Sequence, residues 1–323
     1  MTEGIAKLDL KDRRILYELD KNARLSCTQI GKKVGLSTEV VNYRIKRLEE
    51  EIITQYQLIV NLSKLGILQF KMCLTLQHIN SEKLNKIINE LKKNKAVKWI
   101  VSTKGNWDLI ISLETDSIEN IELLKNEVLG RFSNYVDKKS ISILVEASTY
   151  NRDYLLAGEK TTERKRTIMK RDKEIKLDDL DFSILRELSK NARESLVNVA
   201  TKLKTSVRIV NYRIKQMIKD KVILGFKIAI NYEKLGIKFY KAFVYLDSPK
   251  KERVDELVNY LETNKNVIHH VKVLGNWDLE PEFEVYSEKE FDDIILLLKD
   301  EFSDIIKNLD IITISKEHKF VYF

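Results

Sequence analysis

Two peptides occur twice in this chain, and their spacing constrains its fold more than any other feature. VNYRIK runs from Val41 to Lys46 and again from Val210 to Lys215, and GNWDL runs from Gly105 to Leu109 and again from Gly275 to Leu279. The offsets are 169 and 170 residues. Two echoes at nearly one spacing indicate that a unit of about 170 residues was duplicated. The 323-residue chain should therefore fold as two similar compound units.

The first 60 residues of the repeat predict three short helices. Ser26 can cap the second helix, with Gln29 three residues later completing a capping box. Gly35 suits the left-handed conformation that often follows a helix end, and Ser37 can cap the third helix. Helix, tight glycine turn and helix together predict a helix-turn-helix.

The third helix carries the residues that we expect to contact DNA. Val41, Ile45 and Leu48 share one face and should be buried. The other side presents amide, hydroxyl and cationic groups that can bond base edges or phosphates in a major groove. These residues are Thr38, Glu39, Asn42, Tyr43, Arg44, Lys46 and Arg47, with Arg208, Asn211, Tyr212, Arg213 and Lys215 in the second copy. The competing interpretation is a solvated helix face.

The rest of each repeat predicts an antiparallel sheet with helices on one face. IITQYQLIVN, after Glu51, is typical of strand structure and suggests a wing. Residues 69–146 then alternate in the order βαββαβ, which is that of the ferredoxin-like fold. The open face of each sheet needs a cover, and the other copy's sheet is the obvious partner. Pro281 cannot donate to a ladder, so we expect an edge or bulge there.

Composition limits the compartment and the kind of partner. The net charge is +8, with the positive excess in the middle of the chain and an acidic C-terminal segment, which favours a polyanionic partner at particular faces. Two cysteines without CxxC spacing suggest a reducing compartment. No signal-like or membrane-spanning stretch occurs, so we expect a cytoplasmic protein with no membrane partner. The sequence suggests no catalytic residues, no metal site and no cofactor.

At this point the residues carry a family resemblance. LDLKDRRILYELDKNARLSCTQIGKKVGLSTEVVNYRIKRLEE resembles the N-terminal helix-turn-helix of the Lrp/AsnC (leucine-responsive, feast/famine) transcriptional regulators, and the following βαββαβ unit with its G-x-x-D turn resembles their amino-acid-sensing RAM domain. The resemblance covers nearly the whole chain, twice. Family members usually carry one copy and dimerise through their sheets, so the resemblance implies a covalently fused dimer that binds double-stranded DNA. An amino-acid effector and a homodimer of fused chains are candidate further partners.

The predicted fold is α+β, with two tandem copies of a winged helix-turn-helix domain followed by a ferredoxin-like domain. Five segments follow from the repeat: a helix-turn-helix over 1–60, a βαββαβ domain over 61–151, a charged linker over 152–176, a second helix-turn-helix over 177–230 and a second βαββαβ domain over 231–323.

The GNWDL turns are the candidate effector site that the resemblance implies. The residues carried over by position are Gly105, Asn106 and Asp108, with Gly275, Asn276 and Asp278 in the second copy. A glycine turn allows close backbone approach, and a carboxylate beside free amides could hold the two ends of an amino acid. The alternative is structural: Gly-Asn is good hairpin chemistry, and each aspartate could bond its own turn.

The two copies differ at positions that bear on function. Lys204 replaces the turn glycine in the second copy, at a cost of about 1 kcal/mol if its backbone is left-handed. Arg208 stands where the first copy has Glu39. Both copies are expected to bind DNA, but not the same half-site with equal strength.

Two other functions compete with the regulator hypothesis. A regulator that has lost DNA binding could act as a sensor through protein contacts. Sirohaem decarboxylases share this fold and pair two similar units, but of their histidine-rich motif only His269 and His270 could serve here. Adjacent strand residues point to opposite faces, so the two imidazoles should not share one pocket.

Overall fold

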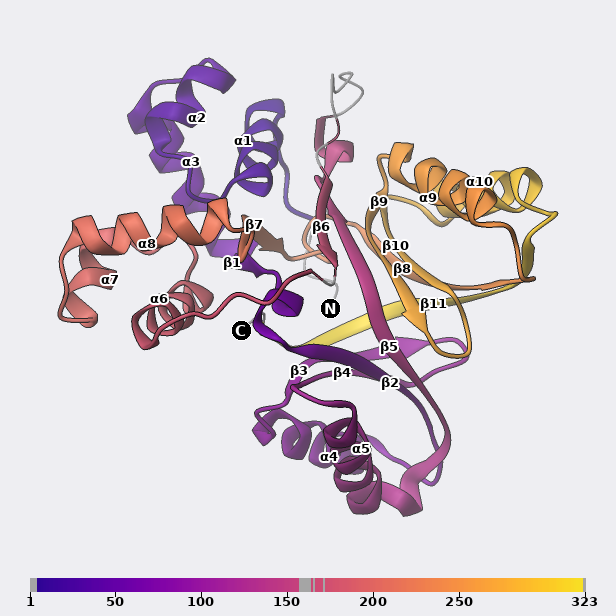
Figure 1. Cartoon of the computed structure of the whole chain (residues 1–323). Helices are drawn as coiled ribbons and strands as arrows, with labels where there is room; N and C mark the ends of the chain where they lie inside the picture. The colour runs from indigo at the N-terminus through magenta and orange to yellow at the C-terminus, as the bar shows by residue number, and fades with distance from the viewer. Residues whose placement is uncertain (1–4, 157–163, 165, 171, 322–323) are drawn as a thin grey trace.

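The computed structural model describes residues 5–156, 164, 166–170 and 172–321 (Figure 1). It contains two helix-turn-helix units, which lie together on one side, and two sheets with helices packed on their outer faces. The predicted α+β class with two tandem copies is confirmed.

Each helix-turn-helix consists of three helices followed by one strand. The first copy contains α1 (Leu10–Lys21), α2 (Cys27–Val34), α3 (Thr38–Glu51) and β1 (Ile53–Val60). The second contains α6 (Asp179–Lys190), α7 (Leu196–Lys202), α8 (Val207–Lys219) and β7 (Ile223–Ile230). The predicted caps are confirmed: Ser26 forms a capping box with Gln29, Ser37 accepts from the Val40 amide, and Gly35 is left-handed.

The predicted strand follows the third helix of each unit, and it pairs with its counterpart in the other copy. β1 pairs antiparallel with β7 of the other copy, from Ile53 opposite Ile230 to Val60 opposite Ile223. The two strands form a separate two-stranded ribbon. A ladder between the copies satisfies the backbone groups of both strands and joins the two helix-turn-helix units directly.

The two domains that follow the helix-turn-helix units have the predicted βαββαβ order. The first consists of β2 (Leu68–Leu76), α4 (Ser81–Lys93), β3 (Val97–Lys104), β4 (Leu109–Thr115), α5 (Ile118–Phe132) and β5 (Val136–Tyr150). The second consists of β8 (Lys238–Leu246), α9 (Lys251–Thr263), β9 (Val267–Leu274), β10 (Leu279–Val285), α10 (Glu288–Glu301) and β11 (Ile306–Phe320). Short 3-10 turns lie at Leu62–Leu65, Ser133–Tyr135 and Asp153–Leu156.

The two sheets are joined edge to edge as well as face to face. The strand order is β2-β4-β3-β11-β8-β10-β9-β5-β6, and an additional β2–β5 pairing closes the first eight strands into a ring. β5 pairs with β2 through its first half and with β9 of the other copy through its second half. β11 does the same with β8 and β3. We call this closed arrangement the barrel.

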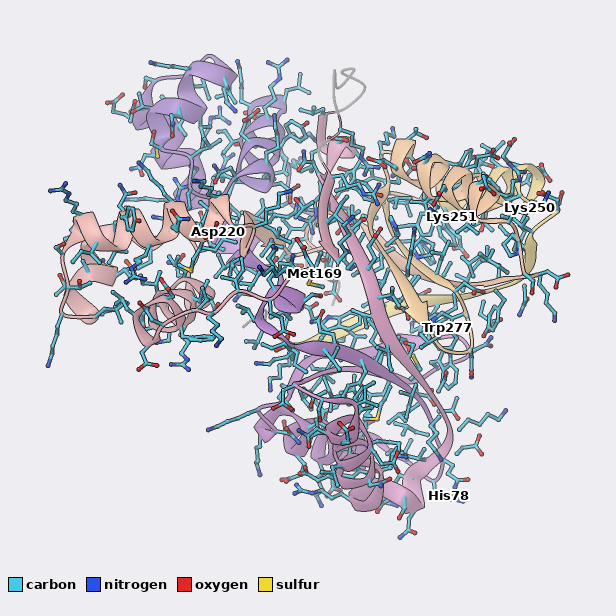
Figure 2. The ribbon with its side chains drawn as sticks, in the orientation of Figure 1. His78, Met169, Asp220, Lys250, Lys251 and Trp277 are labelled. Carbon is cyan, nitrogen blue, oxygen red and sulfur yellow. The ribbon has the colours of Figure 1, made fainter. Side chains whose placement is uncertain are left out.

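Separate apolar clusters fill the layers. One lies between the first sheet and α4 and α5, and an equivalent one lies between the second sheet and α9 and α10. A third joins the facing sheets and contains Trp99, Phe243 and Trp277. Figure 2 shows Trp277 where the two βαββαβ domains meet. The predicted cover of each sheet by the other copy is therefore present within one chain.

The segment 152–176 is more ordered than the predicted linker. Arg152, Tyr154 and Leu155 are buried, and β6 (Arg166–Lys170) pairs antiparallel with the end of β5. Met169 on β6 lies between the helix-turn-helix units and the sheets (Figure 2). Residues 157–163, 165 and 171 of the predicted linker lie outside the described part of the chain.

Pro281 lies in a central strand, so the prediction of an edge was wrong. β10 pairs with β9 on one side, where Pro281 is opposite His270, and with β8 on the other. The β8 ladder keeps one register from Leu279 to Glu282, but the β9 ladder shifts its register between Glu282 and Phe283, next to the proline. An irregularity of this kind agrees with the predicted bulge, because proline lacks the donor of a regular ladder.

Candidate DNA-binding surfaces, effector turns and a junction cavity

The recognition helix of the first copy presents the predicted residues to solvent. Val41, Ile45 and Leu48 are buried, as expected from their spacing. The exposed residues of the predicted set are Thr38, Glu39, Asn42, Tyr43, Lys46 and Arg47. Among them Tyr43 is 68% exposed although it is aromatic. An exposed tyrosine beside an amide and a lysine is an arrangement that can contact phosphates and base edges together.

The second recognition helix, α8, presents a similar face on which one charge is reversed. Arg208, Tyr212 and Lys215 are exposed, and Asn211 is half-buried. Ser206 caps α8 by accepting from the Ile209 amide, so the helix begins at the equivalent position. The second copy thus keeps the geometry of the first while its first exposed turn carries a cation in place of Glu39.

Arg44 and Arg213 have a structural partner in each copy. Arg44 donates to Asp9 at 2.6 Å and to Asp12 at 2.8 Å, and these two aspartates form the capping box of α1. Arg213 lies 2.8 Å from Asp178 and 3.2 Å from Asp181, which form the equivalent box of α6. The two arginines clamp the third helix of each unit to the start of its first helix. Arg47 also donates to Asp12, although its side chain is exposed.

A second pair of arginines joins the two helix-turn-helix units to each other. Arg24 donates to the carbonyl oxygens of Ala192 and Glu194 at 2.6 and 3.0 Å. Arg193, its counterpart in the other copy, donates to the carbonyl oxygens of Ala23 and Leu25. Together with the β1–β7 ribbon, this reciprocal exchange fixes the separation of α3 and α8.

The GNWDL turns are tightly packed against the long strands of the opposite copy. Gly105 has φ +124°, and a Cβ there would lie 2.8 Å from the carbonyl oxygen of Ile311. A Cβ on Gly275 would lie 2.9 Å from the side chain of Ser142. Both glycines are therefore required by close backbone approach, which is a structural reason for their presence.

The two aspartates of the turns have backbone partners. Asp108 accepts from the Leu76 amide at 2.7 Å, and Asp278 accepts from the Leu246 amide at 2.8 Å. Asn106 and Asn276 are exposed and have no hydrogen-bonding partner among the described residues. Of the six predicted effector residues, the glycines and aspartates are thus explained by the fold.

The sequence did not predict a cluster of buried charges that lies inside the barrel. Glu280 lies 2.6 Å from Lys71 and 2.9 Å from Lys241, and Lys241 also contacts Glu282 at 2.7 Å. Burial raises the pKa of Glu280, but Lys241 and Lys71 outweigh burial and hold it well below its usual value. The available signal was a lysine at the same position of two apolar strands, Lys71 in β2 and Lys241 in β8.

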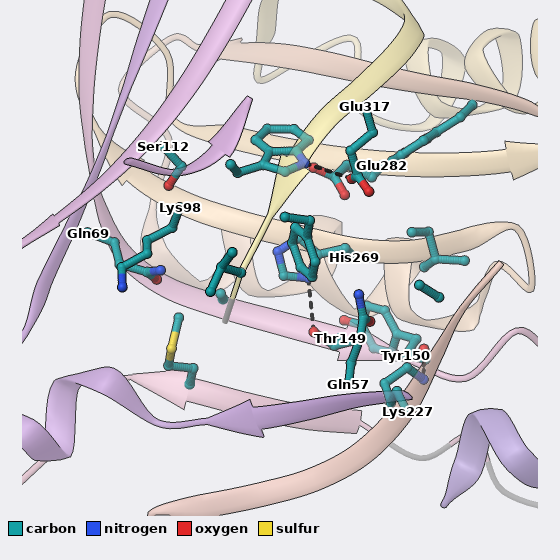
Figure 3. Close-up of a pocket in the computed structure, with 18 of the residues that line it drawn as sticks. Gln57, Gln69, Lys98, Ser112, Thr149, Tyr150, Lys227, His269, Glu282 and Glu317 are labelled. Atoms are coloured by element: carbon teal, nitrogen blue, oxygen red, sulfur yellow. Dashed lines mark hydrogen bonds between the residues drawn. The ribbon is translucent and has the colours of Figure 1, made fainter. Parts of the chain in front are cut away.

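A cavity of about 180 Å³ lies where the ribbon meets the barrel (Figure 3), and we call it the junction cavity. The ribbon contributes Gln57 and Lys227, and the barrel contributes Ser112, His269, Glu282 and Glu317 among others. Figure 3 shows the carboxyl groups of Glu282 and Glu317 on one side, next to His269. None of the six predicted effector residues lines it.

The two histidines point to opposite sides of β9, as the alternation predicted. His269 faces the junction cavity and bonds Thr149 at 3.0 Å. His270 is fully buried and stacks on Tyr150 with ring centroids 5.8 Å apart. Burial lowers the pKa of His269 to about 4, so this imidazole is neutral near pH 7. The cavity therefore contains one histidine.

Two searches of the described residues bear on other site types. No group of three or more histidine, cysteine, aspartate or glutamate side chains in those ranges is arranged to hold a metal ion. Among the same residues, none of the helices combines the length and apolar character that a bilayer-spanning segment requires.

Comparison with known proteins agrees with the helix-turn-helix geometry. A family model described as winged helix-turn-helix DNA-binding matches residues 8–51 and 177–223. The HTH-type transcriptional regulator Ptr1 of Methanocaldococcus jannaschii is 34% identical over 128 residues, which cover 39% of this chain and 78% of that protein. An uncharacterised HTH-type transcriptional regulator of Pyrococcus horikoshii is 32% identical over 116 residues, covering 35% and 77%.

A solved structure matches the whole duplicated architecture. The sirohaem decarboxylase NirDL aligns with a TM-score of 0.59 at 13% identity, covering 97% of this chain and 93% of that one. At this identity the match shows a shared fold. The regulators, in contrast, match in sequence over three quarters of their own length. With the two helix-turn-helix matches, the chain belongs to the Lrp/AsnC family of HTH-type transcriptional regulators and carries two fused copies of the family's unit.

Proposed function

We propose that this protein is a DNA-binding transcriptional regulator that reads one asymmetric operator with two recognition helices of a single chain. The observation that carries the proposal is the outward face of VNYRIK on both α3 and α8, in two units locked together by Arg24 and Arg193. A single helix in a major groove reads only a few base pairs, so two linked readers gain the specificity that one lacks.

The exposed residues divide into base-reading and phosphate-binding groups. Asn42 and Asn211 can bond adenine bidentately, and Lys46 and Lys215 are placed to contact phosphates. We assign Arg44 and Arg213 to positioning, because each is held by two carboxylates of its own unit.

The two half-sites should be related but different. Glu39 on the first turn of α3 repels phosphates and can accept from cytosine, whereas Arg208 at the equivalent place attracts phosphates or bonds guanine. A symmetric operator, as expected for a homodimer, would match only one of the two helices. Pairing of fused chains and an amino-acid effector at the GNWDL turns both stay predictions.

Two alternative functions, a sensor without DNA binding and a decarboxylase, can be distinguished by the ligand that each would bind. A sensor without DNA binding fits the fold but leaves the exposed faces of α3 and α8 without a role. Only the shared fold favours a decarboxylase activity. The junction cavity does not favour it, because the cavity contains one neutral histidine and has a volume of about 180 Å³. That volume is close to the roughly 150 Å³ that accommodates benzene, far below the size of a tetrapyrrole. We therefore propose that the protein is not an enzyme.

The test is selection of DNA from a random library by the full-length chain and by Asn42→Ala and Asn211→Ala. Each variant should lose sequence preference at one half-site, since a good bidentate contact discriminates by roughly 1–3 kcal/mol. Lys46→Ala and Lys215→Ala should instead weaken binding to all sequences and reduce the salt slope by about one. Asn89→Ala on the outer surface of α4 is the matched control.

The proposal fails if both asparagine variants select the same motif as the unaltered chain. It also fails if the unaltered chain selects no motif. Sirohaem added to the protein should leave its absorption spectrum unchanged, and a spectral shift with loss of carboxyl groups would support the enzyme instead.

A further inference from the structure

We propose that the junction cavity is a binding site for a small organic monoamine, held as its ammonium cation with its carbon chain against apolar walls. The site is distinct from the GNWDL turns. The proposal concerns binding where the ribbon meets the barrel and does not depend on the DNA-binding role.

The cavity contains polar atoms that have no hydrogen-bond partner among the described residues. Ser112 is only 6% exposed, lines the cavity, and its hydroxyl makes no hydrogen bond to any described residue. The Gln57 amide likewise has no partner among those residues. Glu282 and Glu317 each engage one carboxylate oxygen, with Lys241 and Trp99 respectively, and leave the other uncommitted. Ser112 and Glu282 are buried, whereas Gln57 is half-buried and Glu317 is exposed. Buried polar groups are almost always satisfied, so the two buried groups point to a polar ligand.

The two carboxylates are the strongest unsatisfied feature. Glu282 and Glu317 lie on the same side of the cavity (Figure 3). Burial raises the pKa of Glu317, and the neighbouring charge of Glu282 raises it further. Glu282 is buried, whereas Glu317 lies among the same groups but keeps an exposed side chain. The two like charges repel, and a cation placed against both would remove that repulsion. A primary ammonium group also supplies three donors for the free oxygens.

The charge of the surrounding cluster favours a single positive charge. The cluster contains two lysines, Lys71 and Lys241, and three glutamates, Glu280, Glu282 and Glu317, so one carboxylate is in excess. His269 beside them is neutral near pH 7 because burial lowers its pKa to about 4. A monocation therefore balances the cluster.

In the described part of the chain, each cation that lines the cavity has a carboxylate partner above about pH 7. Lys71 pairs with Glu280 at 2.6 Å, and Lys98 lies 3.5 Å from Glu114, whose pKa burial raises to about 7. Arg152 and Lys227 share Asp20, at 2.6 and 2.9 Å. A ligand with a carboxylate would have to break one of these pairs, so the site suits an amine better than an amino acid.

The walls and the volume define the rest of the ligand. Trp99, Tyr232, Phe239 and Ile268 line the cavity and can bury a short carbon chain. The volume of about 180 Å³ is slightly above that of a cavity that binds benzene, at roughly 150 Å³. A monoamine of four to six carbon atoms, in order of magnitude, fills such a space.

Three probes of matched shape test the ligand class by isothermal titration of the full-length chain. They are 1-aminobutane, butyrate, and norvaline, which is 1-aminobutane with a carboxylate on the first carbon. We expect 1-aminobutane to bind at least tenfold more tightly than norvaline, and butyrate not to bind. Equal or tighter binding of norvaline or butyrate overturns the proposal, as does the absence of binding by the amine.

Two variants locate the binding. Glu317→Gln keeps an acceptor for Trp99 but removes the charge, and should weaken amine binding at least tenfold. Ser112→Leu fills the cavity with a larger side chain from a different strand and should abolish binding. It tests the site independently if Glu317→Gln fails to fold. Glu82→Gln, on the exposed surface of α4, is the control and should bind like the unaltered chain. Unchanged amine binding by folded Glu317→Gln or Ser112→Leu protein overturns the site.

Discussion

Gly35 and Lys204 hold the same left-handed backbone conformation at the same position of the two repeats, with φ of 68° and 51°. Both residues follow the second helix of a helix-turn-helix and precede the serine that caps the recognition helix. The second copy has thus kept the turn that places α8 while losing the residue that adopts it without strain. Lys204 therefore weakens the second unit without changing its geometry.

Replacement of Lys204 by glycine should stabilise the protein. The left-handed conformation costs a residue with a Cβ about 1 kcal/mol, and glycine removes that cost. The free energy of unfolding should rise by this amount in denaturant titrations. Lys202→Gly, two residues earlier in α7, is the control and should lower it by about 1 kcal/mol because glycine is a poor helix former. A loss of stability in Lys204→Gly would contradict the assigned strain.

Removal of Arg24 and Arg193 should loosen the spacing between the recognition helices. Each charged guanidinium bonds two carbonyl oxygens of the other copy, so each alanine substitution should cost about 1–3 kcal/mol of stability. The double variant should also tolerate changed half-site spacing in the selected DNA. Arg186→Ala removes an equal charge from the exposed face of α6 and should change neither property. Unaltered spacing preference in the double variant would mean that the ribbon alone fixes the helices.

Substitution of the turn aspartates separates a structural role from an effector role. Asp108→Ala and Asp278→Ala each leave a strand-end amide without its acceptor and should cost about 1 kcal/mol, measured by thermal unfolding without ligand. Asp108→Asn and Asp278→Asn keep an acceptor oxygen and should melt near the unaltered protein. If the asparagine variants abolish a response to amino acids that the unaltered chain shows, the turns are effector sites. Alanine variants with unchanged stability would exclude the structural role.

Glu114 should make stability fall as pH rises. Burial raises its pKa from 4.5 to about 7, although Lys98 and Gln69 oppose the shift. The folded state therefore keeps a proton that the unfolded chain loses between pH 4.5 and about 7, so the unfolding free energy declines over that window. Glu114→Gln should match the unaltered chain at pH 4 and exceed it by up to about 3 kcal/mol above pH 7.

The control for this pH profile is Glu82→Gln, since Glu82 is exposed and forms only a surface ion pair with Lys86. Its stability difference from the unaltered chain should be nearly constant with pH. A pH-independent difference for Glu114→Gln as well would show that Glu114 is ionised in the folded state near neutrality.

Local signals in the sequence determined the repeat, the helix-turn-helix and the order of elements. Ser26 with Gln29, Gly35 and Ser37 act within one or two turns of chain, so their effect can be read without knowing the fold. The spacing of Val41, Ile45 and Leu48 likewise defines the buried face of α3 from within the helix. The outward face of VNYRIK follows from the same periodicity.

Only the tertiary structure decided how the two copies join. The pairing of β1 with β7, the division of β5 and β11 between both sheets, and the burial of Arg152 all depend on register between segments far apart in the chain. β1 pairs with β7 because each strand offers the other a partner of the same length that satisfies its backbone groups.

The junction cavity was likewise decided by the tertiary structure. Lys71 is the one charged residue of β2, and Glu280 is one of three glutamates of β10, so on sequence alone each would be assigned to the solvent face. Closure of the sheet into a barrel turns that face inward, where Lys71 and Glu280 pair at 2.6 Å. Charge in a strand is a local property, but whether the strand's polar face meets water depends on which distant strand completes the sheet.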